Sequence, residues 1–173
     1  CRDAMIADLK LVGLWRYNAD GIDICNCENV TVRDCFVRAY DDNIVIKGLK
    51  QVGHLPVRNV RVSGCTLWND WGRALEIGAE TCAPEMDGIE FSDCDIIHTV
   101  HIAMDIQHGD RAAISEVCFR DIRPTSPAAR EIPHGCPALV TTKPIRVDVG
   151  RGAAVRGFRA WRTARRGYRS ARS

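Results

Sequence analysis

The feature that most constrains the fold of this chain is a short motif that recurs every 26 to 30 residues. Its copies are DAMIADL at 3–9, NVTVRDC at 29–35, NVRVSGC at 59–65, GIEFSDC at 88–94 and EVCFRDI at 116–122. Self-similarity at a fixed period of about 20 to 50 residues is typical of solenoids, propellers and arrays. The repeat therefore predicts a fold built from stacked copies of one small unit.

A second apolar segment precedes each of the later copies of this motif. Its versions are DGIDI at 20–24, DNIVI at 42–46, RALEI at 73–77 and HIAMDI at 101–106. The unit thus contains two or three short β-segments, and no helical periodicity occurs up to about residue 125. A propeller blade needs four strands in about 40 to 45 residues, so we expect a parallel β-helix instead, with turns stacked about 4.8 Å apart.

Residues at equal positions in successive turns of such a solenoid form columns along its axis. One column contains Cys35, Cys65 and Cys94, with Leu9 and Ile122 at its two ends. A thiol that shares a column with Leu and Ile is most simply a buried, reduced side chain, since free Cys behaves as a small hydrophobe. A disulfide or metal-binding role is the alternative for the nine cysteines, although no CxxC pair with zinc spacing occurs.

The alternating pattern of the second segment predicts where acidic side chains gather. It directs two columns inward, which are Ile22, Ile44, Leu75 and Met104, and Ile24, Ile46, Ile77 and Ile106. The column between them would face solvent and reads Asp23, Val45, Glu76 and Asp105. The leading edge of the segment reads Asp20, Asp42, Arg73 and Ile102, with Asp41 beside Asp42. Acids of neighbouring turns are therefore expected on one side of one sheet.

Three of these carboxylates, Asp20, Asp41 and Asp42, are expected to meet on adjacent turns. Like charges a few Å apart raise each other's pKa, so the cluster needs compensation. Acids at turns often only cap the turn or pair with a cation, here Arg73 or Lys47. The alternative is a functional site, because glycoside hydrolysis uses one protonated carboxylic acid and ionised carboxylates that activate water. An inverting pair is separated by about 6.5 to 9.5 Å, which side chains on adjacent turns can span.

The residues around these carboxylates resemble glycoside hydrolase family 28, the polygalacturonase-like right-handed parallel β-helices. NADGIDI at 18–24 is similar to the family's Asn-Thr-Asp-Gly-Ile-Asp motif, and DDNIVIKG at 41–48 is similar to its Asp-Asp motif. The two stand one turn apart in the family's order, and the resemblance covers roughly residues 3 to 125. It implies Asp41 as the general acid, Asp20 and Asp42 as holders of the attacking water, inversion, and neither metal nor other cofactor.

Two further motifs of the family are altered in this chain. The Gly-His-Gly motif falls on GRALEIG at 72–78, so Arg73 stands in the place of His. The Arg-Ile-Lys motif falls on DIQ at 105–107, so Asp105 and Gln107 replace two cations. An Asp at that place would repel a uronate that an Arg would bind. The expected substrate is therefore a pectin-like or other plant or microbial cell-wall glycan that is neutral or differently substituted, rather than unmodified polygalacturonate.

Residues near the carboxylates are candidates for substrate binding. The set is Arg73, Glu76, Asp105, Gln107, Lys47, Trp71 and His108. Glu76 and Asp105 could accept hydrogen bonds from sugar hydroxyls. Arg73 could hold a substrate anion or neutralise Asp42, and His108 follows Gln107 at the edge of the expected cleft.

Two Trp residues in the loop LWNDWG, Trp68 and Trp71, could each stack on a sugar ring or pack against their own turn. The alternative to a hydrolase is a β-helix that binds glycan without cleaving it, as a lectin-like module does. The three Asp favour the enzyme, whereas the replaced His and Arg-Ile-Lys positions favour the binding module.

The charge distribution divides the chain into regions. The 173 residues carry a net charge of +2, but residues 149–173 contribute eight Arg and no acid, which leaves −6 on residues 1–148 (+2 minus 8). We expect β-helix turns over 1–125, an irregular Pro-rich segment over 126–148, and a tail over 149–173 that is disordered or not native. A basic tail can bind nucleic acid, but no other feature of the chain suggests such a partner.

The remaining expectations concern location and completeness. No apolar run approaches the roughly 18 to 20 residues that a membrane span needs. The first residues are neither a signal peptide nor a starting Met, so we expect a fragment that begins inside a domain, after any export signal. Neither end has an evident cap over the open strand edges, so a β-helix incomplete at both ends and too short for activity is a third possibility. A polysaccharide or oligosaccharide partner predicts an extracellular or periplasmic monomer.

Overall fold

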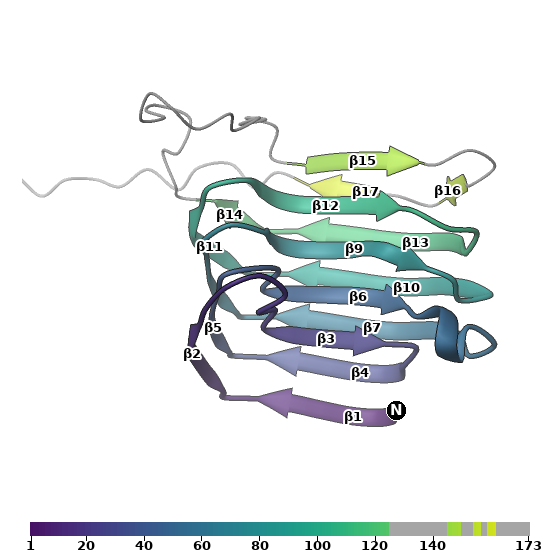
Figure 1. Cartoon of the computed structure of the whole chain (residues 1–173), viewed down its shortest axis with the longest axis horizontal. Coiled ribbons are helices and arrows are strands. Elements are labelled where there is room, and N and C mark those ends of the chain that lie inside the picture. Colours follow the sequence, from purple (N-terminus) through teal and green to yellow (C-terminus); the bar gives the residue numbers. More distant parts are fainter. Residues whose placement is uncertain (125–144, 150–153, 157–158, 162–173) are drawn as a thin grey trace, which may run out of the picture.

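The computed structural model describes residues 1–124, 145–149, 154–156 and 159–161, and these form a right-handed parallel β-helix (Figure 1). Each full turn contributes one strand to each of three sheets, and neighbouring strands in every sheet are parallel. The described residues contain one helical element, the 3-10 helix η1 (Lys50–Val52). The fold class expected from the repeat is confirmed.

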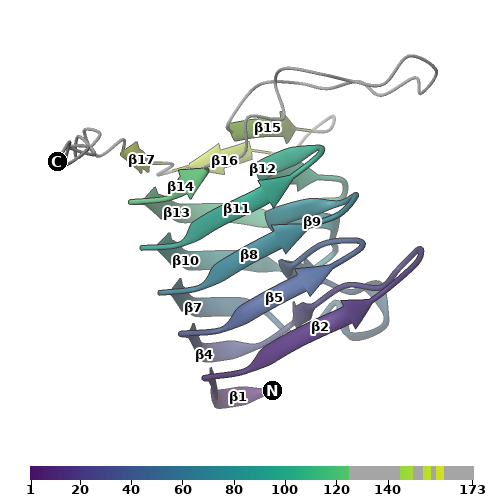
Figure 2. The same cartoon turned by 90° about the vertical axis from the view of Figure 1, so that its left-hand side faces the viewer.

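Strands of successive turns stack in the same order in all three sheets. The first sheet contains β1 (Arg2–Ala7), β4 (Glu28–Arg33), β7 (Val57–Ser63), β10 (Glu85–Ser92), β13 (Ala113–Arg120), β16 (Ala154–Arg156) and β17 (Arg159–Trp161). The second sheet, which faces the viewer in Figure 2, contains β2 (Lys10–Leu14), β5 (Phe36–Ala39), β8 (Thr66–Asn69), β11 (Asp95–Thr99) and β14 (Arg123–Pro124). The third contains β3 (Ile22–Cys25), β6 (Ile44–Gly48), β9 (Arg73–Thr81), β12 (Ile102–His108) and β15 (Ile145–Val149).

The recurring motif forms the strands of the first sheet and the corner that leads into the second. The penultimate residue of each copy sits at this corner with a φ of 50° to 63°, and the five are Asp8, Asp34, Gly64, Asp93 and Asp121. Gly adopts this left-handed conformation without steric cost, and Asp and Asn do so more readily than other residues. The repeated Asp or Gly is therefore the sequence signal for the corner.

The interior is filled by apolar side chains that point inward from all three sheets. The inward columns of the third sheet are in the predicted register: Ile22, Ile44, Leu75 and Met104, and Ile24, Ile46, Ile77 and Ile106. All eight are buried. In the first sheet, the rings of Phe91 and Phe119 stack with centroids 4.8 Å apart. Burial of this continuous apolar stack is the main stabilising contribution to the coil.

The predicted column of buried thiols is confirmed. Cys35, Cys65 and Cys94 follow the corner in successive turns and are 2%, 1% and 0% exposed. Burial raises the pKa of the Cys35 thiol, which keeps it neutral and unreactive. The eight cysteines in the described part of the chain are all free thiols, and Cys136 lies outside that part.

The column expected to face solvent is in the predicted register but is mostly covered. Val45 and Asp105 are 0% exposed and Glu76 is 1% exposed, while Asp23 is exposed. The side chain of Arg73 lies against two of these positions, with Nε 3.8 Å from Glu76 Oε2 and 3.4 Å from Asp105 Oδ2. The expectation of a solvated acidic column is therefore wrong at Glu76 and Asp105, because a cation from the strand's leading edge lies against both.

Most of the segment expected to be irregular, 126–148, and of the Arg-rich tail, 149–173, lies outside the described residues. The described parts of these ranges are β15, which pairs with β12, and β16 and β17, which pair with β13. No helix among the described residues has the length and apolar character needed to cross a membrane.

Candidate active site

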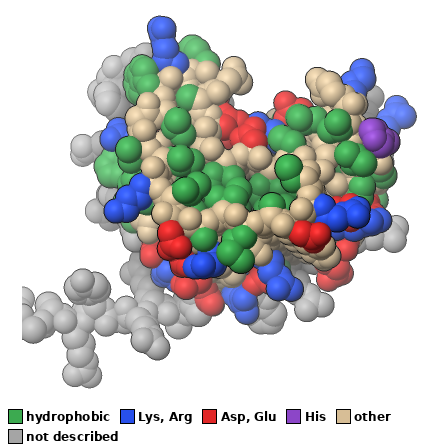
Figure 3. All heavy atoms as spheres, turned by 90° about the horizontal axis from the view of Figure 1, so that it is seen from below, with side chains coloured by type: hydrophobic (Ala, Val, Ile, Leu, Met, Phe, Trp, Pro, Cys, Tyr) green, Lys and Arg blue, Asp and Glu red, His purple; other side chains and the backbone are tan. Residues whose placement is uncertain are grey.

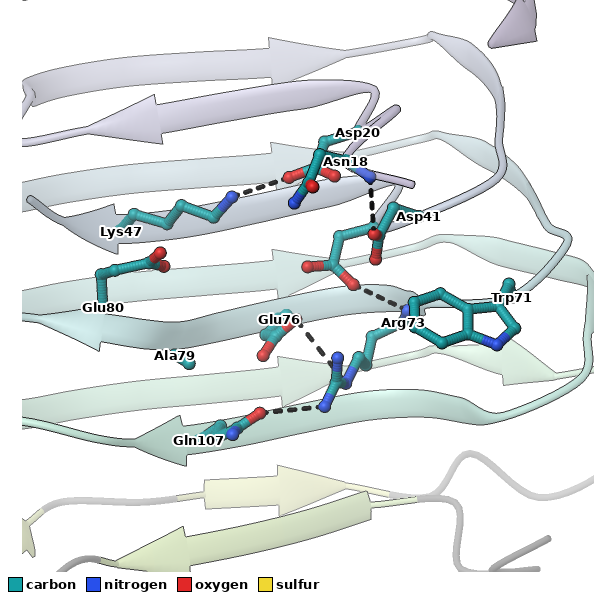
Figure 4. A pocket seen from close by; sticks show the side chains of 11 residues that line it. Asn18, Asp20, Asp41, Lys47, Trp71, Arg73, Glu76, Ala79, Glu80 and Gln107 are labelled. Carbon is teal, nitrogen blue, oxygen red and sulfur yellow. Dashed lines mark hydrogen bonds and ion pairs between the residues drawn. The ribbon is translucent and has the colours of Figure 1, made fainter. Parts of the chain in front are cut away.

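A pocket of about 250 Å³ opens on the outer side of the third sheet (Figure 4). Its lining consists of Asn18, Asp20, Asp41, Asp42, Lys47, Trp71, Arg73, Glu76, Ala79, Glu80 and Gln107. In Figure 3, which views the molecule from its N-terminal end, acidic side chains lie in a notch between two raised parts of the surface. Five carboxylates face two cations in this lining, so the pocket is acidic.

Three carboxylates from two successive turns converge in this pocket. Asp20 lies two residues before strand β3, and Asp42, with Asp41 beside it, lies two residues before β6. One oxygen atom from each carboxylate lies within 4.8 Å of the other two. The two loops are held together by backbone hydrogen bonds: Gly21 N donates to Asp42 O at 2.8 Å and Asp41 N donates to Ala19 O at 3.3 Å.

The third turn holds the Asp41–Asp42 pair from the other side. A Cβ atom at Gly72 would lie 2.6 Å from the carbonyl carbon of Asp41 and 2.7 Å from Asp42 Oδ1. The buried amide of Asn69 donates to the carbonyl oxygens of Asp41, at 2.6 Å, and of Arg73, at 3.2 Å. The backbone N–H of Arg73 donates to Asp42 Oδ1 at 2.8 Å. The position of both carboxylates therefore depends on the absence of a side chain at residue 72.

The surroundings of Asp41 favour a protonated carboxylic acid. Burial raises the pKa of Asp41 above its ordinary value, and the negative charges of Asp42 and Asp20 act in the same direction. The backbone N–H of Asn18, which donates to Asp41 Oδ2 at 3.1 Å, opposes this shift without cancelling it. Asp41 thus keeps its proton to a higher pH than a free Asp side chain does.

Lys47, from strand β6, neutralises the acids of the first turn. Its Nζ lies 2.7 Å from Asp20 Oδ2 and 2.8 Å from Asp23 Oδ2. Burial acts to lower the pKa of Lys47, but the hydrogen bonds with the two carboxylates outweigh it and raise the pKa. The sequence left open that the acids of the cluster only form ion pairs with a neighbouring cation. Asp20 does so with Lys47. Asp41 has no cation at ion-pair distance among the described residues.

Arg73 is engaged by groups of the protein itself. Besides its ion pairs with Glu76 and Asp105, its guanidinium donates to Gln107 Oε1 at 2.9 Å. Burial raises the pKa of Glu76 to about 9, and the hydrogen bond and charge of Asp42 add to this shift. The sequence suggested that Arg73 either holds a substrate anion or neutralises Asp42. In the structure its guanidinium lies at ion-pair distance from Glu76 and Asp105 rather than from Asp42.

The remaining substrate-binding candidates separate into two groups. Trp71 and Gln107 line the pocket, whereas Asp105 is fully buried against Arg73. His108 is 2% exposed and continues the alternation of the inward residues Met104 and Ile106 in β12. It is not among the residues that line the pocket. Burial lowers the pKa of His108, which favours the neutral imidazole. The structure therefore does not bring His108 to the cleft edge where its sequence position suggested it.

The two Trp residues expected in one loop have different surroundings, because Trp68 belongs to strand β8 and Trp71 lies in the loop that follows it. Trp68 lies on the outer face of the second sheet, where its ring packs against His98 with centroids 4.8 Å apart and the Arg38 guanidinium lies 5.0 Å from its centroid. Its indole N–H donates to Asp70 Oδ1 at 2.8 Å. Trp71 is 47% exposed and lines the pocket. Trp68 is therefore a packing residue, and Trp71 alone of the two can meet a ligand in the pocket.

Sequence reasoning did not name Asn18, Ala79 or Glu80, although they line the pocket. Asn18 belongs to the NADGIDI stretch that carries Asp20. Ala79 and Glu80 reach the pocket because the pairing of β6 with β9 shifts register between Ile46 and Gly48. A glycine inside a strand pattern is a recognised sign of such a bulge, and Gly78, with a φ of 116°, was that signal.

The same three Asp are also the group of side chains, within the described residues, that could together hold a metal ion. Hard divalent cations such as Ca²⁺ bind carboxylate oxygens. In this pocket the Nζ of Lys47 already supplies positive charge to Asp20. The expectation of a metal-free site stays a prediction, which chelation tests.

Comparison with protein families gives a match of residues 1–132 to the family described as glycosyl hydrolases family 28. Comparison with curated proteins gave no match, and neither did comparison with solved structures. The matched range includes every residue that lines the pocket. It supports a glycoside hydrolase function in general terms.

Proposed function

The chain belongs to glycosyl hydrolases family 28, and from this premise we propose that it hydrolyses O-glycosidic bonds of a polysaccharide or oligosaccharide at the Asp20, Asp41 and Asp42 cluster. The observation that carries the proposal is the convergence of the three carboxylates within 4.8 Å of one another in an acidic pocket. Glycoside hydrolysis needs carboxyl groups of two kinds, one that donates a proton and one that accepts a proton from water. The unequal surroundings of the three groups support this division.

Asp41 is the general acid in this proposal. Its burial and its two acidic neighbours favour the protonated form. In the reaction, Asp41 donates its proton to the glycosidic oxygen as the bond from that oxygen to the anomeric carbon breaks. The resulting carboxylate is stabilised by the hydrogen bond from the backbone N–H of Asn18 at 3.1 Å.

Asp20 and Asp42 are the groups that hold the attacking water. Two hydrogen bonds of about 2.8 Å each can link oxygen atoms up to about 5.6 Å apart through one water molecule. The oxygen atoms of Asp20 and Asp42 lie within 4.8 Å of each other, so one water can contact both. As the water oxygen bonds to the anomeric carbon, its proton passes to one of these carboxylates.

The spacing predicted from the turn-to-turn distance needs a correction. One oxygen atom of each Asp lies within 4.8 Å of one oxygen atom of the other two, whereas roughly 6.5 to 9.5 Å usually separates the two carboxyl groups of an inverting acid and base. The closeness arises because hydrogen bonds join the two loops directly. We still propose inversion, since the bridged water occupies its own position beside the acid, and ¹H NMR of the first product tests it. A product with the substrate's anomeric configuration would instead make Asp20 or Asp42 a nucleophile.

The charge of the pocket bears on the substrate. Five carboxylates and two cations line it, and the guanidinium of Arg73 already contacts Glu76, Asp105 and Gln107. The carboxylate of a uronate would be repelled by the net negative charge of this pocket lining, in which both cations already pair with carboxylates of the protein. We therefore propose a neutral or esterified cell-wall glycan, pectin-like or other, as the substrate. Since such a glycan lies outside the cytoplasm, we also propose that the protein acts outside the cell or in the periplasm, as a monomer.

The test is reducing-sugar release from a panel of neutral, esterified and acidic polysaccharides. The wild-type chain is compared with Asp41→Asn and with a matched control, Asp95→Asn, whose carboxylate lies on the second sheet and pairs with Arg123. We expect activity on one neutral or esterified glycan, unchanged in the control and at least about 100-fold lower in Asp41→Asn. Equal activity of Asp41→Asn and wild type would refute the assignment of the acid.

The alternative function is a glycan-binding β-helix that does not cleave its ligand. The replacement of the family's cations by Asp105 and Gln107, and of its His by Arg73, favours this alternative. A glycan that binds the wild-type chain without any release of reducing ends would support it over the hydrolase.

A further inference from the structure

Four aromatic side chains from three successive turns form a continuous cluster beside the pocket, here called the aromatic strip. Its members are Trp15, Tyr17, Tyr40 and Trp71. Ring centroids of Trp15 and Tyr40 lie 4.8 Å apart, those of Tyr17 and Trp71 lie 5.7 Å apart, and those of Tyr40 and Trp71 lie 5.9 Å apart. Trp15, Tyr17 and Trp71 are 68%, 74% and 47% exposed. Aromatic surface of this extent outside the core indicates a binding surface.

The aromatic strip is continuous with the pocket on each of the three turns. Trp71 belongs to both, and in Figure 4 its ring lies on the same side of the pocket as Asp41 and Arg73. Tyr17 directly precedes the pocket residue Asn18, and Tyr40 directly precedes Asp41. Stacked strands are about 4.8 Å apart, so three turns carry the strip over about 10 Å along the axis. The strip thus runs along the axis beside the two turns that carry the carboxylates and reaches the next turn at Trp71.

The size of the pocket indicates what covers the strip. A volume of about 250 Å³ is below the range of about 300 to 1,000 Å³ typical of ligand pockets. It leaves room for little more than the sugar ring at the bond that reacts. Further units of a glycan chain must then lie outside the pocket, where the strip offers aromatic faces to their apolar C–H surfaces.

We propose that the aromatic strip binds the sugar units adjacent to the reacting bond, so that the protein selects glycan chains over disaccharides. This inference rests on the proposed function, because it takes the carboxylate pocket as the place of cleavage. The strip contributes affinity through ring packing and needs no charge on the ligand, which agrees with the acidic lining of the pocket.

Affinity electrophoresis tests the proposal, with every variant made in the Asp41→Asn background so that the ligand stays intact. The gels contain galactan, arabinan, xylan or xyloglucan as neutral probes, or polygalacturonate. Trp71→Ala and Tyr17→Ala are each expected to weaken binding to one neutral probe about tenfold, as loss of an aromatic anchor does. Trp68→Ala is the matched control, since its ring packs against Arg38 and His98 away from the pocket, and it should change binding less than about twofold.

Several outcomes overturn the proposal: unchanged binding in Trp71→Ala, an equal loss in Trp68→Ala, or no binding of any probe by the parent chain. A lower oligomeric state of Trp71→Ala in light scattering would also overturn it and make the strip a contact between copies of this chain. Failure of the proposed function is a separate result. If binding depends on Trp71 but the wild-type chain does not hydrolyse the glycan, the strip binds glycan and the proposed hydrolase function is wrong. If hydrolysis occurs but does not depend on Trp71 or on the length of the glycan chain, the hydrolase function holds and the proposed role of the strip is wrong.

Discussion

Replacing Arg73 by Met is expected to destabilise the fold by about 3 to 5 kcal/mol near pH 8, because breaking a buried ion pair leaves an uncompensated charge. The side chains of Glu76 and Asp105 are 2% and 0% exposed, and that of Arg73 is 21% exposed. Both carboxylates are therefore shielded from water in the wild-type protein. Met keeps an unbranched apolar stem in place of that of Arg73 and lacks the guanidinium, so the substitution removes mainly the charge.

The size of this effect follows from the ion-pair distances. Unit charges about 4 Å apart interact by about 4 kcal/mol at an effective dielectric constant of about 20. Burial raises the pKa of Glu76 to about 9, so near pH 8 that group is mostly protonated. The pair of Arg73 with Asp105, at 3.4 Å, then contributes most of the loss.

The effect of Arg73→Met should depend on pH. Without the cation, the pKa of the buried Glu76 carboxyl group rises further, and the folded state keeps its proton. Stability linked to a raised carboxyl pKa is present below the unfolded-state pKa of about 4 and is lost as the pH rises through the folded-state value. The destabilisation should therefore be small near pH 4 and largest near pH 8.

Urea unfolding at pH 4, 6 and 8 measures this difference. The matched control is Arg38→Met, whose partner Asp70 lies 3.0 Å away on the outer face of the second sheet, where Arg38 is 49% exposed. Exposed pairs of this kind contribute about 0 to 1 kcal/mol. The triple variant Arg73→Met, Glu76→Gln, Asp105→Asn should recover most of the loss. A loss no larger than that of Arg38→Met, or one equal at pH 4 and pH 8, would refute the reasoning.

Three further predictions concern the site. Gly72→Ala should lower kcat about 100-fold, since a Cβ there would lie 2.6 Å from Asp41 and displace both acids; unchanged kcat in steady-state assays would contradict the close approach. Glu76 has a pKa raised to about 9 from 4.5, so wild-type stability should fall between those pH values, and Glu76→Gln should remove most of that slope in thermal melts. Excess EDTA should change hydrolysis less than about twofold if no metal takes part, whereas a loss restored by Ca²⁺ would assign the three Asp as ligands.

The periodic part of the fold could be predicted from the sequence. The interval between motif copies, the alternation around Ile22 and Ile24, and the Cys35 column all gave the register that the structure has. The reason is that parallel strands bonded turn to turn keep residues of equal phase in one column. The Asp or Gly at each corner is a further sequence signal that we did not use for prediction, and it exists because few residues adopt a positive φ.

Tertiary structure decided the features that the repeat does not set. The burial of Glu76 and Asp105 depends on the direction that Arg73 takes, and the 4.8 Å separation of the carboxylates depends on bonds between two loops. Trp68 and Trp71 stand three residues apart in the chain, yet Trp68 is in strand β8 and only Trp71, in the loop after it, lines the pocket. Strand periodicity encodes which side of a sheet a residue faces. Contacts between residues far apart in the chain decide where a loop directs a side chain. They also decide which aromatic rings of three different turns meet.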